Sequence, residues 1–204
     1  MRVEGIETEL VAIADKLRSI TVEIANHRSG GSGVIWSADG LVITNAHVVK
    51  GLKTRVKLSN GKYIAGKVIA SDTQQDLAAI QLNIERNSSL STPTIGNSLL
   101  LRPGEIVLAM GSPYGFSGTL TMGVVHAPIE GELSKTKLNW AKTSIVAYPS
   151  GAIATDIRLA PGNSGGVLAN ALGEVVGINT AIISRLAMAI PAHQVEHFVN
   201  TIKR

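Results

Sequence analysis

Residues 161–166 read Pro-Gly-Asn-Ser-Gly-Gly and lie between two apolar segments. Glycine accepts tight left-handed turns that other residues resist, so this loop can lift the hydroxyl group of Ser164 off the surface and align neighbouring N–H groups. Aligned N–H groups are what an acyl-transfer enzyme uses to hold a developing oxyanion. Short Gly/Ser loops also occur as plain hairpins, so Ser164 is a candidate nucleophile only if the chain also supplies a base and an acid.

The candidate base is His47, because a serine hydroxyl is a weak nucleophile that a histidine must activate. His47 follows the apolar segment that ends at Thr44, and the end of a strand on a rigid scaffold can hold a catalytic side chain in place. The alternative is a buried histidine that bonds only to the backbone of its own loop.

The candidate acid is Asp76, which directly precedes the apolar residues 77–80. A carboxylate buried there without a partner would be costly, so Asp76 is expected to face a donor such as Nδ1–H of His47. Asp72 is a weaker alternative, because its surroundings are typical of an exposed turn. The order His47, Asp76, Ser164 is that of chymotrypsin-type hydrolases.

The elements that must position these residues are mostly short strands. Apolar residues first recur at spacings of three and four up to Ile20, which predicts an N-terminal helix over residues 1–19. We expect it to dock on the protein's own core, with contact to a second copy as the alternative. The strands are then predicted at 21–25, 33–36, 41–44, 54–58, 64–70 and 77–82, and at 106–110, 119–126, 152–155, 167–169, 175–183 and 186–190.

Such short strands separated by turn signals are typical of an all-β fold, either a barrel or a sandwich in each half. Residues 85–93 are predicted to form a linker between the halves, and residues 128–150 a long loop. Residues 192–203 carry apolar side chains on one helical face and predict a closing amphipathic helix.

Composition excludes several classes of function. The 204 residues include no cysteine, so neither a disulfide nor a thiol nucleophile is available. The net charge is only +4, the Lys and Arg residues are scattered along the chain and aromatic residues are few, all of which disfavours nucleic-acid binding. No apolar run is long enough to span a membrane.

Acidic residues interrupt the first 20 positions, so no signal peptide is predicted. The expected location is cytoplasmic if Met1 is the native start, and periplasmic or otherwise extracytoplasmic if the chain was trimmed.

Several segments together resemble the signature blocks of the HtrA (Deg) family. They read Thr-Asn-Ala-His-Val-Val at 44–49, Asp-Leu-Ala-Ala-Ile at 76–80, Gly-Ser-Pro-Tyr-Gly at 111–115 and Gly-Asn-Ser-Gly-Gly at 162–166, with Thr-Asp at 155–156 and Gly-Ile-Asn-Thr at 177–180. The resemblance runs from about residue 20 to the C-terminus. It implies a serine endopeptidase of protein quality control and stress response that cuts unfolded or misfolded polypeptides without a cofactor.

The resemblance also implies the architecture. A single trypsin-like protease domain would contain two six-stranded antiparallel β-barrels, residues 20–84 and 100–191, with a helix at each end of the chain. The catalytic triad of His47, Asp76 and Ser164 would lie between the barrels.

The same resemblance implies roles for the residues around the triad. Gly162, Asn163 and Ser164 would form the oxyanion hole, with the N–H groups of Gly162 and Ser164 as donors. Residues Asn179, Thr180 and Ala181 would pair with the backbone of an extended substrate.

In trypsin-like folds, which the resemblance implies, the residue six positions before the serine lies near the base of the S1 pocket, and in this chain that residue is Arg158. The family pattern implies small aliphatic P1 residues, whereas an arginine reaching into the pocket would favour an acidic P1. We expect Arg158 to point to solvent, because a buried unpaired arginine is costly.

The chain departs from the family pattern in several respects. No PDZ domain follows within the 204 residues, and the first aromatic residue is Trp36, which argues against the trimer that family members lock through N-terminal aromatics. Asn163 replaces the aspartate that trypsin-type zymogens pair with a freed N-terminus, so ordering of loops 128–150 and 184–188 by a substrate or partner is the expected substitute. His193 and His197 share a spacing that can hold a metal, but we expect a solvated helix face there.

A catalytically silent or chaperone-like peptide-binding barrel is the alternative function.

Overall fold

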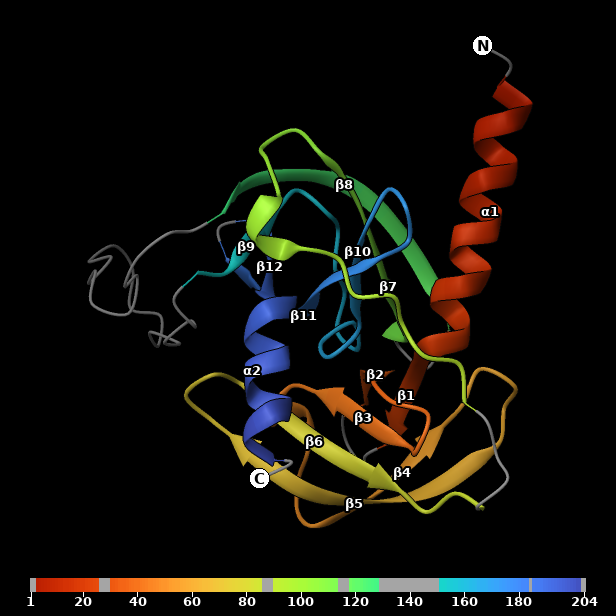
Figure 1. Ribbon diagram of the computed structural model, residues 1–204, viewed down its shortest axis with the longest axis vertical. Coiled ribbons are helices and arrows are strands. Elements are labelled where there is room, and N and C mark those ends of the chain that lie inside the picture. The colour runs from red at the N-terminus through yellow and green to blue at the C-terminus, as the bar shows by residue number, and fades with distance from the viewer. Residues whose placement is uncertain are drawn as a thin grey trace.

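The computed structural model describes residues 3–25, 30–85, 90–113, 118–128, 151–183 and 185–202. Its first half is a closed antiparallel barrel, here called barrel 1, with strand order β1-β2-β3-β6-β5-β4 (Figure 1). The strands are β1 (Thr21–Ala25), β2 (Gly31–Ile35), β3 (Leu41–Thr44), β4 (Lys53–Lys57), β5 (Tyr63–Asp72) and β6 (Leu77–Leu82).

The second half forms a matching barrel, here called barrel 2, with order β10-β11-β12-β9-β8-β7. Its strands are β7 (Ile106–Gly111), β8 (Thr119–Pro128), β9 (Ile153–Thr155), β10 (Val167–Asn170), β11 (Val175–Ile183) and β12 (Leu186–Pro191). The predicted all-β class with two six-stranded antiparallel barrels is therefore confirmed. The predicted loop over 128–150, apart from Pro128 at the end of β8, and the middle of the predicted linker, residues 86–89, lie outside the described residues.

Each barrel has its own core of β-branched and aliphatic side chains. Barrel 1 buries Val22, Ile24, Ile35, Val42, Val56, Val68 and Ile80, and barrel 2 buries Val107, Val125, Ile153, Leu168 and Val176. A third cluster between the barrels includes Leu77, Leu108, Met110, Ile178 and Phe198. Because a fully buried side chain of this size contributes about 1.5–3 kcal/mol, this third cluster holds the two barrels in a fixed relation, which any site between them needs.

Two helices flank the barrels. Helix α2 (Ala192–Ile202) lies across both of them (Figure 1) and buries Val195, Phe198 and Val199. Near its first turn, Oγ of Ser98 accepts the backbone N–H of His193 at 3.2 Å and lies 2.9 Å from Nδ1 of the same residue. Ser98 belongs to the short 3₁₀ helix η2 (Ser98–Leu100). Its hydroxyl satisfies a helix-terminal donor that would otherwise be unpaired.

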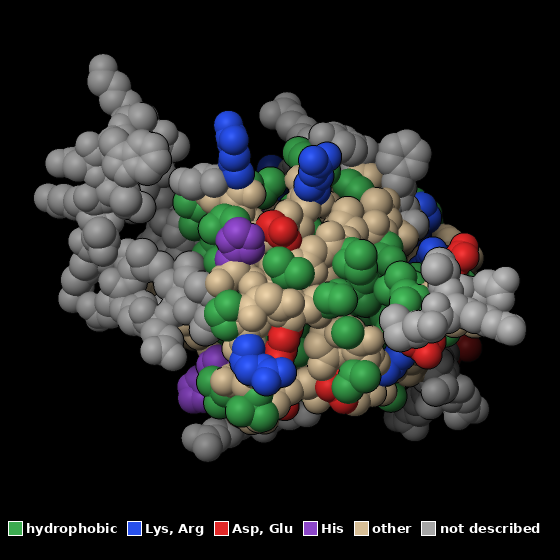
Figure 2. Space-filling view, turned by 90° about the horizontal axis from the view of Figure 1, so that it is seen from above, with side chains coloured by type: hydrophobic (Ala, Val, Ile, Leu, Met, Phe, Trp, Pro, Cys, Tyr) green, Lys and Arg blue, Asp and Glu red, His purple; other side chains and the backbone are tan. Residues whose placement is uncertain are grey.

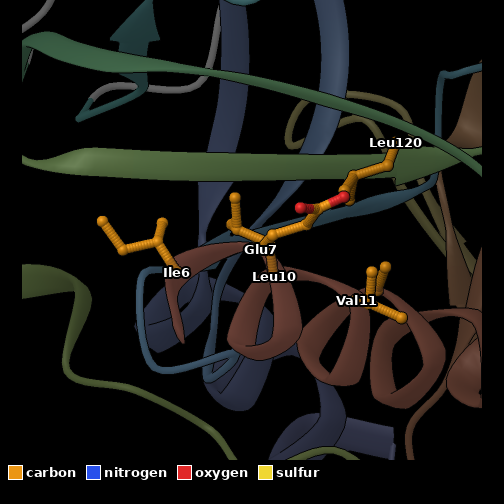
Figure 3. A pocket seen from close by; sticks show the side chains of 6 residues that line it. Ile6, Glu7, Leu10, Val11 and Leu120 are labelled. Carbon is orange, nitrogen blue, oxygen red and sulfur yellow. The ribbon is translucent and has the colours of Figure 1, made fainter. Parts of the chain in front are cut away.

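Helix α1 (Val3–Ile20) docks through its residues from Leu10 onward, of which Leu10, Ile13 and Ala14 are partly buried against the cluster between the barrels. Leu17 and Ile20 are fully buried in the cluster between the barrels, as expected for a helix that docks on its own core. The N-terminal turns extend past the barrel strands (Figure 1), where Ile6 and Val11 remain exposed along a shallow groove against Leu120 of β8 (Figure 3). Neither α1 nor α2, the two α-helices of the described part of the chain, is both long and apolar enough to cross a membrane.

Candidate active site

The predicted base and acid come together at one end of barrel 1. His47 lies in the 3₁₀ helix η1 (Ala46–Val48), directly after β3, and Asp76 lies in the turn between β5 and β6 with φ of +53°. Oδ1 of Asp76 accepts the backbone N–H of His47 at 3.1 Å, and both carboxylate oxygens lie 2.9 Å from Nδ1 of the ring. Aspartate is among the few residues that tolerate a positive φ, so the turn can carry an acid where it meets the histidine.

The Asp76 carboxylate fixes which ring nitrogen of His47 can act as a base. Burial, the largest single effect, raises the pKa of Asp76, but hydrogen bonds from His47 and Thr180 and the charge of His47 together lower it by more. The group is therefore ionised at neutral pH, and an ionised carboxylate can only accept hydrogen bonds. Nδ1 of His47 must carry a proton toward Asp76, which leaves Nε2 of the neutral ring as the free acceptor.

Asp72, the alternative acid, has a different task. Its carboxylate accepts the backbone N–H groups of Gln74 at 2.8 Å and Gln75 at 3.0 Å, and it also accepts the Gln75 side chain at 2.7 Å. The backbone hydrogen bond from Gln75 is the main reason that the pKa of Asp72 is lowered. Asp72 therefore stabilises the turn that leads to Asp76 and does not contact His47.

Thr180 connects the candidate nucleophile to the candidate acid. Its hydroxyl group donates to Oδ2 of Asp76 at 2.6 Å, and its backbone carbonyl accepts the hydroxyl group of Ser164 at 2.9 Å. The three predicted residues are thus joined across the two barrels through one residue of β11. The Ser164 hydroxyl has to release Thr180 before it can donate to His47, and such rearrangement is common when a site without substrate becomes occupied.

The glycine-rich loop takes the conformation that its sequence predicted. Gly162 has a φ of +104° and Gly165 a φ of +84°, values that favour glycine. The N–H groups of Asn163, Gly165 and Gly166 donate to the carbonyl groups of Ala160, Asn179 and Asn163, at 3.0, 2.8 and 3.0 Å. Among hydrogen bonds between described residues, the N–H groups of Gly162 and Ser164 donate to no acceptor. These two can serve an oxyanion, whereas Asn163, also assigned to the oxyanion hole, has its own N–H engaged within the turn.

Ser32 is a residue of this site that the sequence did not reveal. It is fully buried, and its hydroxyl donates to the carbonyl of Gly162 at 2.7 Å and accepts the N–H of Ser112 at 2.8 Å. Its own N–H donates to the carbonyl of Ser164 at 2.8 Å, and its carbonyl accepts the Thr44 hydroxyl at 2.7 Å. Every polar group of Ser32 is used, so barrel 1 holds the nucleophile loop of barrel 2 through this one residue.

The predicted substrate-binding strand is only partly available. Asn179 is committed to the nucleophile loop, because its amide side chain donates to the Val167 carbonyl at 2.6 Å and its N–H donates to the Gly166 carbonyl at 2.9 Å. β10 pairs with β11 as far as Ile178, and residues 181–183 pair only with β12 among the described strands. The open edge at Ala181 is where an extended peptide could add a strand. Arg158 is exposed.

The comparisons with known proteins agree with this geometry. Residues 31–178 match the family model of the trypsin-like peptidase domain. The chain belongs to the trypsin-like peptidase family. Within that family its relatives are HtrA/Deg proteases: HhoB from Synechocystis sp. is 40% identical over 179 residues and mitochondrial serine protease HTRA2 from Bos taurus is 38% identical over 174 residues, each match covering 84% of this chain.

A solved structure gives the same relationship in three dimensions. The HtrA-type protease AlgW, determined with a decapeptide, superposes with a TM-score of 0.79 at 26% identity over 94% of this chain and 66% of AlgW. The chain spans only 40% of the length of HhoB and 36% of that of HTRA2. It is thus similar to the protease part of these HtrA/Deg relatives.

Proposed function

We propose that this protein is a serine endopeptidase that hydrolyses unfolded or misfolded polypeptides in protein quality control. The observation that carries the proposal is the continuous set of hydrogen bonds from His47 through Asp76 and Thr180 to Ser164, beside two N–H groups with no acceptor among the described residues. Its relatives are HtrA/Deg proteases, and AlgW was solved with a peptide bound.

The mechanism follows from the geometry of the donors and acceptors. Oγ of Ser164 attacks the scissile carbonyl while Nε2 of His47 takes its proton, and the imidazolium is stabilised by Asp76. The N–H groups of Gly162 and Ser164 hold the resulting oxyanion. His47 then gives its proton to the leaving amine, the peptide bond breaks, and an acyl group remains on Ser164. Water, deprotonated by His47, releases the acyl group by the reverse sequence.

A fluorophosphonate probe tests the proposal directly, because it phosphonylates only an activated serine. We expect mass spectrometry of the labelled protein to find the adduct on Ser164, together with hydrolysis of denatured casein. A second candidate function, a silent peptide-binding barrel, is favoured by the hydrogen bond of Ser164 to Thr180 in place of His47. Binding of denatured casein without labelling or hydrolysis would support that second function.

Replacing Ser32 with alanine should impair turnover more than binding. The change leaves the Gly162 carbonyl and the Ser112 N–H without their buried partner, at about 1–3 kcal/mol each. If about 1.4–2.7 kcal/mol of this is lost from oxyanion stabilisation, kcat falls about 10- to 100-fold while KM changes less than about threefold. Steady-state kinetics on a fluorogenic peptide measure the two constants.

Ser98→Ala is the matched control for this variant. Ser98 is also a buried serine whose hydroxyl both accepts an N–H and contacts a second polar atom, but it serves the first turn of α2. We expect Ser98→Ala to lower the melting temperature and leave kcat unchanged. An equal loss of kcat in both variants would mean that Ser32 acts only on stability.

Replacing Arg158 with alanine should leave the P1 preference unchanged, because the Arg158 side chain is exposed. Profiling of wild type and variant with a peptide library varied at P1 is the measurement, and we expect each P1 residue to keep its rank. A loss of cleavage confined to peptides with Glu or Asp at P1 would show instead that the guanidinium group reaches the S1 pocket.

A further inference from the structure

One segment of barrel 1 accounts for the net positive charge of the chain. Residues 50–71 contain six Lys or Arg residues and no Asp or Glu, whereas the rest of the chain has thirteen basic and fifteen acidic residues. The pairing of β4 with β5 brings several of these cations onto one face of the sheet. Lys53, Arg55 and Lys67, with Tyr63, lie on the outer face of β4 and β5, and we call these four residues the basic face.

The register of the two strands places like charges side by side. Lys53 lies directly opposite Lys67, and Arg55 and Lys57 share the face of Lys53 because side chains alternate along a strand. Lys57 pairs with Glu23 at 3.3 Å, while Lys53, Arg55 and Lys67 form no ion pair with a described acidic side chain. Like charges opposite each other in a sheet are destabilising, so an acidic ligand would relieve a repulsion that is built into the fold.

Apolar side chains accompany these cations. Leu52, Tyr63 and Ile69 are exposed to 72%, 47% and 42%, and the Leu52 carbonyl accepts the N–H of Val68, which places Leu52 beside β5. The end of the molecule formed by barrel 2, seen from above in Figure 2, instead shows Lys and Arg side chains spaced apart. The basic face is therefore a local feature with both positive charge and apolar contact area.

The basic face begins close to the candidate active site. β4 starts six residues after His47, and β5 ends four residues before Asp76. Six extended residues span at most about 20 Å. A polypeptide bound at His47 therefore needs only about six residues beyond the scissile bond to reach Lys53.

We propose that the basic face is an exosite that binds acidic segments of polypeptide substrates; this inference rests on the proposed function. A single-stranded nucleic acid fits less well, because it binds by stacking on open aromatic rings and the ring of Tyr63 is covered by Arg55, whose guanidinium carbon lies 4.6 Å from the ring centroid. The exosite selects substrates by charge at a distance from the scissile bond, independently of the P1 residue.

Matched fluorogenic peptides test the exosite. All share one cleavage core, and an extension of about ten residues, rich in either Glu or Gln, is attached on either side of it. We expect a difference for an extension on at least one side of the core. At low ionic strength the KM of the Glu-rich peptide should be about five- to tenfold lower than that of the Gln-rich peptide, because several surface ion pairs act together. The kcat of the two peptides should be the same. The ratio should approach one at about 1 M salt, where screening extends to about 3 Å, and also for extensions of only about two residues.

Lys67→Glu should abolish this preference, whereas Lys16→Glu, the same charge change at an exposed position of α1, should preserve it. Equal KM values for the Glu-rich and Gln-rich peptides, or equal effects of the two variants, would overturn the exosite while hydrolysis itself still supports the proposed function. If neither peptide is cleaved, the proposed function fails, and fluorescence anisotropy of the Glu-rich peptide with wild type and Lys67→Glu still decides whether the face binds acidic segments. A third outcome is that wild type shows no preference for the Glu-rich peptide but binds phosphatidylglycerol vesicles or oligonucleotides, and that Lys67→Glu loses this binding. That outcome would assign the basic face to another polyanion and overturn the proposal.

Discussion

Replacing Ser164 with alanine is expected to lower kcat on an unfolded protein substrate by a factor of about 10⁶. In a serine protease the nucleophile and the base act as a unit, and removal of the nucleophile alone costs about as much as removal of the whole triad. The residual rate comes from the oxyanion donors, which the variant keeps because the N–H groups of Gly162 and residue 164 are backbone groups. Hydrolysis of denatured casein, followed for wild type and variant at the same concentration, gives the ratio.

The same substitution should leave the fold intact. Alanine removes one hydrogen bond, from the Ser164 hydroxyl to the Thr180 carbonyl, which contributes about 1 kcal/mol. We therefore expect a similar melting curve and unchanged affinity for a peptide. Hydrolysis at the wild-type rate by the purified variant would remove Ser164 from the mechanism.

How far the sequence predicts the fold is clear from individual strands. The bounds of β1, β3, β6 and β11 match the predicted segments, because runs of β-branched and aliphatic residues ended by turn residues carry the information locally. β2 begins two residues earlier than predicted. The prediction placed its start at residue 33 because Gly30-Gly31 is typical of a turn. In the fold, neighbouring side chains leave no room for a Cβ at Gly31 or Gly33: a Cβ at Gly31 would lie 2.5 Å from Cγ1 of Val48, and one at Gly33 would lie 2.8 Å from Cγ1 of Val42.

The candidate site shows the same division between local and distant information. Motifs within a few residues identified His47, Asp76 and the loop around Ser164 as candidates. The partners that fix their orientation are remote, since Thr180 bonds to Asp76 across 104 positions and Ser32 bonds to Gly162 across 130. Only the closure and packing of both barrels brings such pairs together, so a single sequence cannot specify them.

Replacing Asp76 with asparagine is expected to lower kcat by a factor of about 10⁴ with the geometry of the loop preserved. The amide nitrogen of asparagine would donate to Nδ1 of His47, which moves the ring proton to Nε2 and removes the acceptor that Ser164 needs. The amide oxygen can still accept the backbone N–H of His47, and the Thr180 hydroxyl can turn to accept from the amide nitrogen, so the expected defect lies in the tautomer of His47. The kcat of the purified variant on a fluorogenic peptide is the measurement.

Acid conditions give Asp76→Asn a second signature. Because the pKa of Asp76 is lowered in the folded state, the carboxylate contributes stability that is present above its unfolded pKa of about 3.9 and is lost as the pH falls through the lower folded value. The free energy of unfolding of wild type should therefore exceed that of the variant most at pH 7, and the excess should shrink below about pH 4. Urea unfolding at several pH values measures it.

Asp72→Asn is the matched control, because the pKa of Asp72 is also lowered and its carboxylate stabilises the adjoining turn. We expect this variant also to lose acid-dependent stability but to keep the wild-type kcat. The pair separates stability from catalysis: both carboxylates support the fold above their folded pKa values, and only Asp76 touches His47. If kcat fell equally in both variants, Asp76 would contribute to catalysis by stabilising the turn, and not by orienting the ring of His47.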